Sequence, residues 1–265
     1  PFIFQYTPES EAPAEFTFYL PNHKAFCGAE LVSRNLHNLY TLRGAKVRDA
    51  IAWSGFIDEA MSLFPETETY FASHHWPLWG KDAVNDFLEK QRDVYKYIHD
   101  QSVRLMNAGY TPNEIADQIA LPKSLDGNFS TRGYYGTVKH NAKAVYQRYL
   151  GWFTANPSKL DPLPEQESAI RMLAMMGGSE PVMKEAHRLL KSAHSAKKDA
   201  DKEYQWIAQL LNTLVFADPE NEEAKQLLAK AYDQLAYQAE SGPWRDFYLS
   251  GAFELRHGGP DEGIN

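Results

Sequence analysis

The spacing of apolar residues in the first 75 positions indicates β-strands. Four short stretches are rich in apolar and aromatic residues, at 2–6, 16–20, 24–29 and 69–73, and the second of them begins with apolar and polar residues in alternation. Short runs of this composition are typical of strands. The second and third stretches are separated by Pro21-Asn22-His23, so we predict a hairpin with a short polar turn there.

Between these strands and beyond them, the apolar residues recur at helical spacing. Segment 47–64 carries one apolar stripe and is ended by Pro65, and segment 81–107 carries a longer one that stops before Gly109. Thr111-Pro112-Asn113-Glu114 has the composition of a capped helix start. A further helix is predicted after the glycine-containing loop 123–136, as far as residue 149.

A polar, proline-rich segment at 156–164 predicts a domain boundary or a sharp change of direction. The chain beyond it is almost wholly helical, with helices predicted over 164–176, 180–193, 202–216, 222–240 and 244–256. Residues 217–221 and the helix after them have the pattern of one tetratricopeptide-like helix pair. Strands followed by a block of helices predict an α+β fold.

Composition bounds the function without identifying it. A length of 265 residues is enough for two domains, and 43% hydrophobic with 23% charged residues is ordinary for a globular protein. The net charge of −8 argues against a nucleic-acid-binding surface. The single cysteine, Cys27, excludes an intramolecular disulfide, and no apolar run reaches transmembrane length. Because Phe2–Tyr6 already has strand character and the first residue is Pro1, we expect the sequence to begin inside a domain.

Segment 30–44 concentrates the candidate chemistry. Glu30 follows an apolar strand, where a carboxylate at the rim of a sheet is well placed to hold a ligand. Asn38 and Arg43 add an amide and a planar guanidinium suited to a tetrahedral oxyanion. Glu11 precedes a second strand and His74 follows another, so a mixed oxygen and nitrogen metal site is one interpretation. The spacing alone favours the other interpretation, in which Glu11 and Glu30 are surface carboxylates and His74 caps a strand.

Longer motifs resemble a known family. They are E-A-P-A-E, then A-E with H-N-L-Y-T-L-R-G-A, then S-H-H-W-P, K-Q-R-D-x-Y-K-Y-I-H-D-Q, R-G-Y-Y-G-T-V-K-H-N-A-K-A-V-Y-Q-R-Y-L-G-W and Y-Q-A-E-S-G-P-W-R-D-F-Y-L-S-G-A. Together they closely resemble the alkyl sulfatases of the SDS-hydrolase type, which are dinuclear zinc enzymes of the metallo-β-lactamase superfamily. The resemblance covers nearly the whole chain.

The resemblance implies roles for five of the residues. Glu11 matches a ligand of the first metal, Glu30 the carboxylate that bridges two Zn²⁺ ions, and His74 a ligand of the second. Asn38 and Arg43 match the pair that binds the sulfate group, and Arg43 would also stabilise charge on the leaving group. Hydrolysis of an alkyl sulfate to an alcohol and inorganic sulfate is the activity that follows.

A sixth candidate, Tyr135, lies in the loop that the resemblance places near the mouth of the active site. Some relatives carry histidine at this position. A phenol has an unperturbed pKa of about 10, so Tyr135 is a hydrogen-bond donor but a weaker acid near neutral pH. Nearby His140 is interpreted as structural.

The resemblance also implies a domain organisation and partners. Residues 1–120 correspond to the C-terminal part of a metallo-β-lactamase-like αβ sandwich, 121–258 to a helical dimerisation domain and 259–265 to a tail. We therefore expect a homodimer formed through the helical domain. Relatives with signal peptides favour a periplasmic or secreted protein.

The metal site expected from the resemblance is incomplete in this sequence. The superfamily's H-x-H-x-D-H loop does not occur in the 265 residues. We expect the missing ligands on an upstream segment, and the chain alone to be inactive. Two alternatives stay open: a non-catalytic dimerisation fragment, and a related hydrolase acting on a phosphoester or thioester.

Overall fold

The computed structural model describes residues 1–195 and 200–259, and the predicted tail from residue 260 onward lies outside them. The chain forms two compact units, which divide between Asn156 and Pro157. This division falls at the start of the proline-rich segment that the sequence indicated. The family-based boundary at 120/121 lies inside the first unit.

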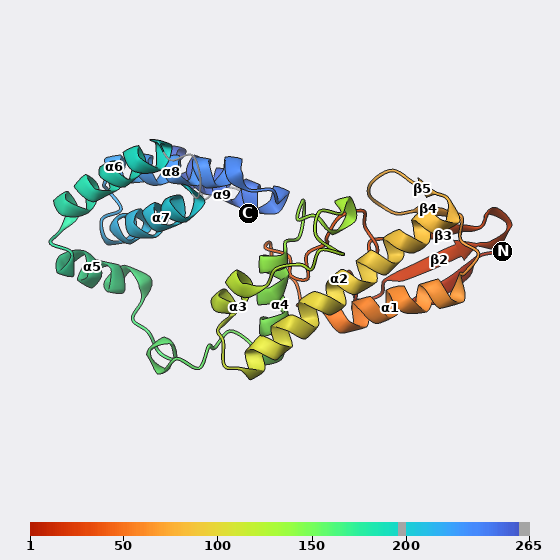
Figure 1. The fold of residues 1–265 in the computed structure, drawn as a ribbon. Coiled ribbons are helices and arrows are strands. Elements are labelled where there is room, and N and C mark those ends of the chain that lie inside the picture. Colours follow the sequence, from red (N-terminus) through yellow and green to blue (C-terminus); the bar gives the residue numbers. More distant parts are fainter. Residues whose placement is uncertain (196–199, 260–265) are drawn as a thin grey trace. The chain divides into compact units, whose positions relative to one another are not determined.

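Unit 1 contains one five-stranded sheet with the order β1-β2-β3-β4-β5 (Figure 1). Its strands are β1 (Ile3–Tyr6), β2 (Phe16–Leu20), β3 (Ala25–Cys27), β4 (Thr69–Phe71) and β5 (Leu78–Trp79). Every neighbouring pair is antiparallel except β3 and β4, which are parallel. The sequence predicted the first four strands and missed the two-residue β5.

Four helices complete unit 1: α1 (Ala50–Leu63), α2 (Lys81–Asn107), α3 (Pro112–Gln118) and α4 (Val138–Leu150). Helix α1 starts three residues later than the hydrophobic stripe suggested, because the Asp49 side chain caps it by accepting from the amides of Ile51 and Ala52. At α3, Thr111 and Glu114 form the predicted capping box. Helix α2 packs against α1 on one side and against α3 and α4 further along (Figure 1).

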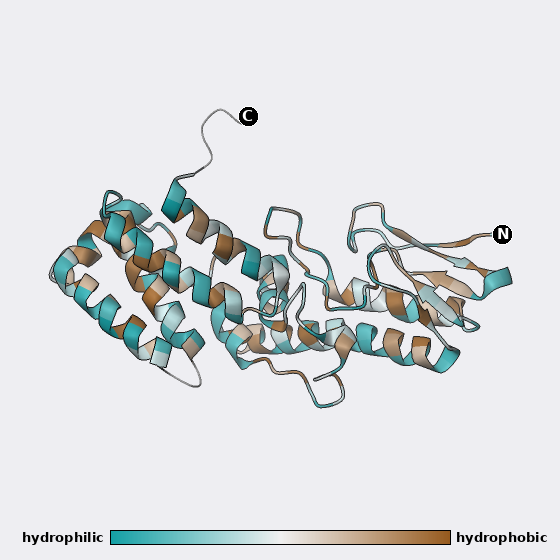
Figure 2. Cartoon of the chain, turned by 90° about the horizontal axis from the view of Figure 1, so that it is seen from above, coloured by the Kyte–Doolittle hydropathy of each residue, from teal (hydrophilic) through white to brown (hydrophobic). Residues whose placement is uncertain are grey.

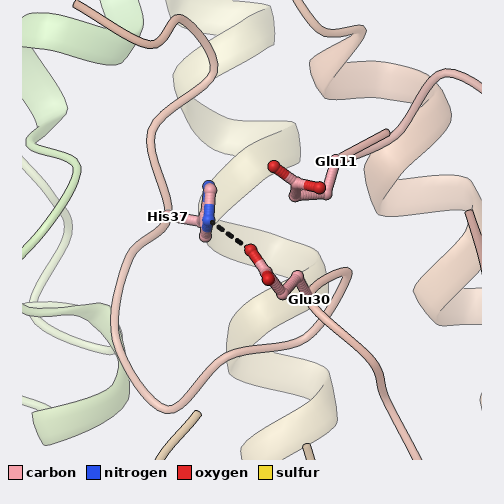
Figure 3. Close-up of side chains that lie close together, drawn as sticks. All are labelled: Glu11, Glu30 and His37. Carbon is pink, nitrogen blue, oxygen red and sulfur yellow. Dashed lines mark ion pairs between the residues drawn. The ribbon is translucent and has the colours of Figure 1, made fainter. Parts of the chain in front are cut away.

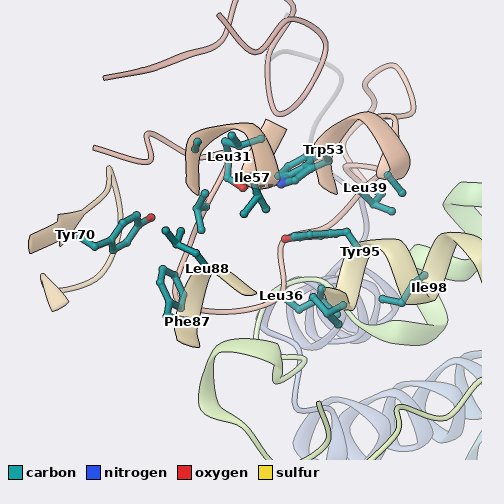
Figure 4. Packing of buried hydrophobic residues seen from close by; sticks show 14 of the residues in the cluster. Leu31, Leu36, Leu39, Trp53, Ile57, Tyr70, Phe87, Leu88, Tyr95 and Ile98 are labelled. Carbon is teal, nitrogen blue, oxygen red and sulfur yellow. Dashed lines mark hydrogen bonds between the residues drawn. The ribbon is translucent and has the colours of Figure 1, made fainter. Parts of the chain in front are cut away.

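The core of unit 1 lies between α1, α2 and the segment that follows β3. Trp53 and Tyr95 face each other across it with ring centroids 5.1 Å apart, and both are fully buried (Figure 4). The Trp53 indole donates a hydrogen bond to the Leu31 carbonyl oxygen. Burial of this many aromatic and aliphatic side chains fixes the loop from residue 31 to 39, which has no regular secondary structure.

Unit 2 is all helical in the residues described. Its helices are α5 (Glu165–Met175), α6 (Ser179–Ser195), α7 (Ala200–Ala217), α8 (Glu222–Gln238) and α9 (Gly242–His257). Helix α7 packs against α5, α6 and α8, and α8 packs against α9, around a separate apolar core. Figure 2 shows apolar and polar positions alternating along the helices. The α+β class predicted from the sequence is confirmed. None of the described helices has the length and apolar character needed to cross a membrane.

Candidate metal centre

The parallel pairing of β3 and β4 brings Glu30 and His74 together. Each residue follows the last residue of its strand by three positions, and the carboxyl ends of parallel strands meet at one edge of a sheet. The Ser73 amide continues the pairing by donating to the Ala29 carbonyl oxygen at 3.1 Å. As a result, His74 Nε2 lies 3.2 Å from Glu30 Oε1. The sequence located both strand ends but not their parallel pairing.

Two further side chains complete a cluster around Glu30. One ligand atom each from Glu11, Glu30 and His37 lies within 4.8 Å of the others. Figure 3 shows the three side chains pointing toward one another, Glu30 and His37 from one loop and Glu11 from a separate stretch of chain, with His37 Nε2 3.6 Å from Glu30 Oε2. Glu30 thus contacts His37 with one carboxylate oxygen and His74 with the other. The cluster joins two predicted metal ligands, Glu11 and Glu30, to a histidine that the sequence analysis did not select.

The electrostatic environment keeps Glu30 ionised. The hydrogen bond from His37 and the nearby charge of His74 outweigh partial burial and lower the pKa of Glu30 to about 2. Glu15 fixes the backbone beneath it, since its Oε1 accepts from the Glu30 and Leu31 amides at 2.9 and 3.1 Å. Burial raises the pKa of Glu15 itself. A carboxylate that stays charged at neutral pH is a ready ligand for a divalent cation.

Arg48 is the charged residue that the sequence analysis missed. It is only 8% exposed, and its guanidinium forms an ion pair with the Glu11 carboxylate. Its Nε donates to the Glu11 carbonyl oxygen at 2.8 Å, while Nη1 donates to both the backbone and side-chain oxygens of Asn38 at 2.8 and 2.9 Å. Arg48 therefore holds Glu11 and Asn38 in fixed positions relative to each other.

The two residues predicted to bind sulfate lie in different environments. Asn38 is 3% exposed, and its side-chain oxygen Oδ1 accepts a hydrogen bond from Arg48. The side-chain nitrogen Nδ2 is therefore the atom that can donate to an anion. Arg43 is exposed beside Gly44, whose amide donates to Thr41 in a turn. No described contact joins Arg43 to Asn38 or to the carboxylates, so its sulfate-binding role stays a prediction.

Tyr135, the remaining predicted catalytic residue, lies against the cluster. Its ring centroid is 5.0 Å from that of His37, at an interplanar angle of 54°. Gly136 makes this approach possible, because a Cβ at that position would lie 2.4 Å from the His37 carbonyl carbon and oxygen. The Gly136 amide also donates to the Leu36 carbonyl oxygen at 2.8 Å. The loop is thereby fastened directly to the segment that carries His37.

The backbone of residues 37–39 is held by buried side chains from two helices. The His37 amide donates a hydrogen bond to the hydroxyl oxygen of Tyr95, on α2, at 3.0 Å. Asn141 of α4 donates to the His37 carbonyl oxygen and accepts from the Leu39 amide, both at 2.9 Å. This irregular segment therefore has partners for the backbone groups of His37 and Leu39 and for the Asn38 carbonyl without a strand or helix of its own.

The donor set suits a metal ion of the zinc type. Two carboxylates and an imidazole converge from two segments of the chain, and the imidazole of His74 contacts the Glu30 carboxylate. Arg48 holds the Glu11 carboxylate in an ion pair. Mixed oxygen and nitrogen ligands are those that Zn²⁺ accepts. His37 could have been suspected from its position next to Asn38, whereas Arg48 had no signal because it reaches Glu11 across 37 positions.

Comparison with known proteins connects this geometry to a family. Residues 111–258 match the family described as alkyl sulfatase dimerisation. The chain is 49% identical over 257 residues to a linear primary-alkylsulfatase of Pseudomonas sp., covering 96% of this chain and 37% of that protein. It is 48% identical over 261 residues to an alkyl/aryl-sulfatase of Saccharomyces cerevisiae, covering 98% of this chain and 39% of that protein.

A solved structure agrees with these sequence matches. The stereoselective inverting sec-alkylsulfatase Pisa1 from Pseudomonas sp. superposes with a TM-score of 0.91 at 43% identity, covering 97% of this chain and 40% of that one. In each comparison the chain spans well under half of its relative's length.

Proposed function

The chain belongs to the alkyl sulfatase dimerisation family, and from this premise we propose that it is part of an enzyme that hydrolyses alkyl sulfate esters to an alcohol and inorganic sulfate. The observation that carries the proposal is the convergence of Glu11, Glu30 and His37 beside the buried Asn38. A metal-ligand set next to an amide donor is the arrangement that hydrolysis of a tetrahedral oxyanion ester requires.

In this proposal Glu11, Glu30, His37 and His74 would hold zinc, and Glu30 would be the central ligand, since its two oxygens face different histidines. Bound zinc would supply Lewis acidity and a water of lowered pKa. The protein's own groups do the rest. Arg48 keeps Glu11 aimed at the cluster, and the Asn38 amide donates to a sulfate oxygen.

Arg43 and Tyr135 have supporting roles in the proposal. Arg43 lies in the turn that follows Asn38 and offers a planar, charged donor set for the sulfate group. Tyr135 packs on His37, which places a phenol beside the cluster as a hydrogen-bond donor toward the leaving alcohol oxygen.

We propose further that an upstream segment of the enzyme completes this site. Two zinc ions need about four ligands each, which exceeds what the described cluster offers even with a shared carboxylate. The sheet also has an uncovered aromatic face. Phe2, Phe4 and Phe16 are each at least half exposed, the rings of Phe2 and Phe4 contact that of Phe18, and Phe16 contacts Phe4. A second layer packed on this face would be typical of a sandwich.

The test combines metal analysis with sulfate release. After dialysis against zinc-free buffer, the chain alone should retain well under two equivalents of zinc and release no sulfate from dodecyl sulfate. Adding an upstream segment with the H-x-H-x-D-H loop should restore both, and Glu30→Gln should abolish the restoration. A preference for dodecyl phosphate would identify a phosphoesterase instead. Restored zinc without turnover on any ester would support the non-catalytic alternative.

We also propose that unit 2 forms a homodimer through a groove between α5 and α7. The groove has a volume of about 580 Å³ and is lined mainly by methionine, leucine and tryptophan side chains. Met175 is 88% exposed, Met172 55% and Trp206 51%. Monomeric proteins rarely leave such patches open, and a second copy of the same surface can close them symmetrically. The family description covers all of these residues.

Light scattering on the chain at micromolar concentration tests the dimer. We expect a dimer that the double substitution Met172→Gln, Met175→Gln converts to a monomer. Tyr237→Gln is the matched control, because Tyr237 is 73% exposed on α8 but does not line the groove. A monomeric parent protein, or a double variant that stays dimeric, would rule out this interface.

A further inference from the structure

Unit 2 contains a second pocket, formed by α6, α7 and α8, that brings two lysines together. Its volume is about 400 Å³. Lys191 from α6 and Lys230 from α8 line it, together with His187 and His194 from α6. The chain carries a net charge of −8 with histidine counted as neutral, so two lysines in one pocket are a local exception to its acidic character.

The acidic groups near the pocket do not neutralise it. Asp233 also lines it, but its carboxylate is bound by Arg256. Glu223 pairs with His187 at 3.0 Å. Among residues 1–195 and 200–259, no carboxylate forms an ion pair with Lys191, His194 or Lys230.

Three of the residues that line the pocket are mainly apolar. Leu227 is 4% exposed and Tyr204 3% exposed, and Leu190 belongs to the same apolar cluster. Burial raises the pKa of Tyr204, so its hydroxyl keeps its proton and serves as a donor. Within the described parts of the chain, this hydroxyl has no hydrogen-bond partner. A hydroxyl donor in the same pocket as two lysines that form no ion pair is suited to an anion that enters from solvent.

We propose that this α6–α8 pocket binds an oxyanion of the sulfate or phosphate class. Lys191 and Lys230 supply charge from two helices, Tyr204 donates a hydrogen bond from below, and Leu190 and Leu227 accept any apolar group attached to the anion. The site consists of unit 2 residues alone. It is separate from the Glu11, Glu30 and His37 cluster of unit 1 and does not depend on the proposed hydrolysis.

Calorimetric titration of the whole chain tests the proposal with three probes: inorganic sulfate, octanesulfonate and octanol. Octanesulfonate has no ester bond, so it cannot be hydrolysed. We expect octanesulfonate to bind and the double substitution Lys191→Gln, Lys230→Gln to weaken it about tenfold or more, because two charges are lost. Tyr204→Phe should weaken it as well. The matched control is Lys184→Gln, which removes an exposed lysine from α6 outside the pocket.

The probes also identify the source of the anion. Sulfate binding that the double substitution abolishes would support a site for the free ion. Binding of octanesulfonate without sulfate would support the head group of an amphiphile. The unit 1 cluster is the same in all variants, so the difference between them reports only this pocket. Equal affinity in the parent, the double variant and the Lys184 control would overturn the proposal, as would octanol binding as tightly as octanesulfonate.

Discussion

At the scale of single residues, the candidate site depends on side chains that never face a ligand. Tyr95 is fully buried, and its hydroxyl oxygen accepts the His37 amide at 3.0 Å. Tyr95→Phe removes only that oxygen and leaves the amide unpaired, which should lower the free energy of unfolding by about 1–3 kcal/mol. Urea denaturation of the parent and the variant measures this difference in the free energy of unfolding. Tyr97→Phe on the same helix is the control, since that hydroxyl is exposed and its loss should change stability by less than about 0.5 kcal/mol. Equal losses of stability at both positions would show that the hydrogen bond between Tyr95 and the His37 amide does not stabilise the site.

His140 provides a pH-dependent contribution to stability. Its Nε2 donates to the Tyr40 carbonyl oxygen at 2.6 Å, and burial lowers its pKa in the folded protein. As the pH falls, His140 is therefore protonated near pH 6.5 in the unfolded chain but only at a lower pH in the folded protein. The stabilising effect of a neutral His140 is complete above that pH and is lost as the pH falls toward the lower folded pKa.

The substitution His140→Gln keeps a donor for Tyr40 but removes the titration. Between pH 7 and pH 5, we expect the parent protein to lose more stability than the variant, and denaturant unfolding at several pH values gives both slopes. Parallel curves over this range would show that His140 is not held neutral in the folded protein.

The residues also show how far the sequence alone could go. Glu11, Glu30 and Asn38 were assigned to one site only through the family resemblance, since their spacing favoured surface carboxylates, and the structure brings them into one neighbourhood. Arg48 could not be predicted, although it lies in the helical stripe expected over 47–64, because that stripe marks apolar positions and says nothing about the partner of a charged one. Its role arises from a tertiary contact, which no local spacing encodes.

At the scale of elements, the loop 133–136 is fixed by the absence of a side chain at one position. A methyl group on Gly136 would meet the backbone of His37 and Asn38 at 2.4–2.5 Å, and backbone cannot move aside as a flexible side chain can. Gly136→Ala should therefore destabilise unit 1 by about 1–3 kcal/mol and weaken zinc binding.

Gly133→Ala is the matched control in the same loop, because the nearest atom to its added Cβ is the Thr137 Cγ2 at 3.5 Å, an ordinary contact. Thermal unfolding followed by circular dichroism, with zinc titration of each variant, distinguishes the two. If both substitutions had the same effect, loop flexibility and not the close approach to His37 would be responsible.

Helices and strands were the part of the fold that the sequence predicted best. Amphipathic periodicity located the long α2 to the residue, because its apolar face is continuous over seven turns and a glycine follows it. The strands and their pairing in the sheet were harder to predict from the sequence. Short strands such as β5 carry too few residues for a period, and the parallel pairing of β3 with β4 depends on the helix that connects them.

At the scale of the whole molecule, the two units have separate hydrophobic cores. The unit 1 core is built around residues such as Ile57 and Trp53, and the unit 2 core around Leu211 and Ile207, with no residue shared. Each unit exceeds 100 residues and buries its own apolar side chains, which is the usual condition for independent folding. We therefore expect two unfolding transitions in calorimetry.

Matched core substitutions assign these transitions. Leu211→Ala and Ile57→Ala each remove a fully buried aliphatic side chain, at a cost of about 2–5 kcal/mol. Leu211→Ala should lower the midpoint of one transition by about 10 °C and leave the other unchanged, and Ile57→Ala should do the reverse. Because each substitution serves as the control for the other, the assignment does not depend on which unit melts first. A single transition that both substitutions shift equally would mean that the two cores unfold as one cooperative unit.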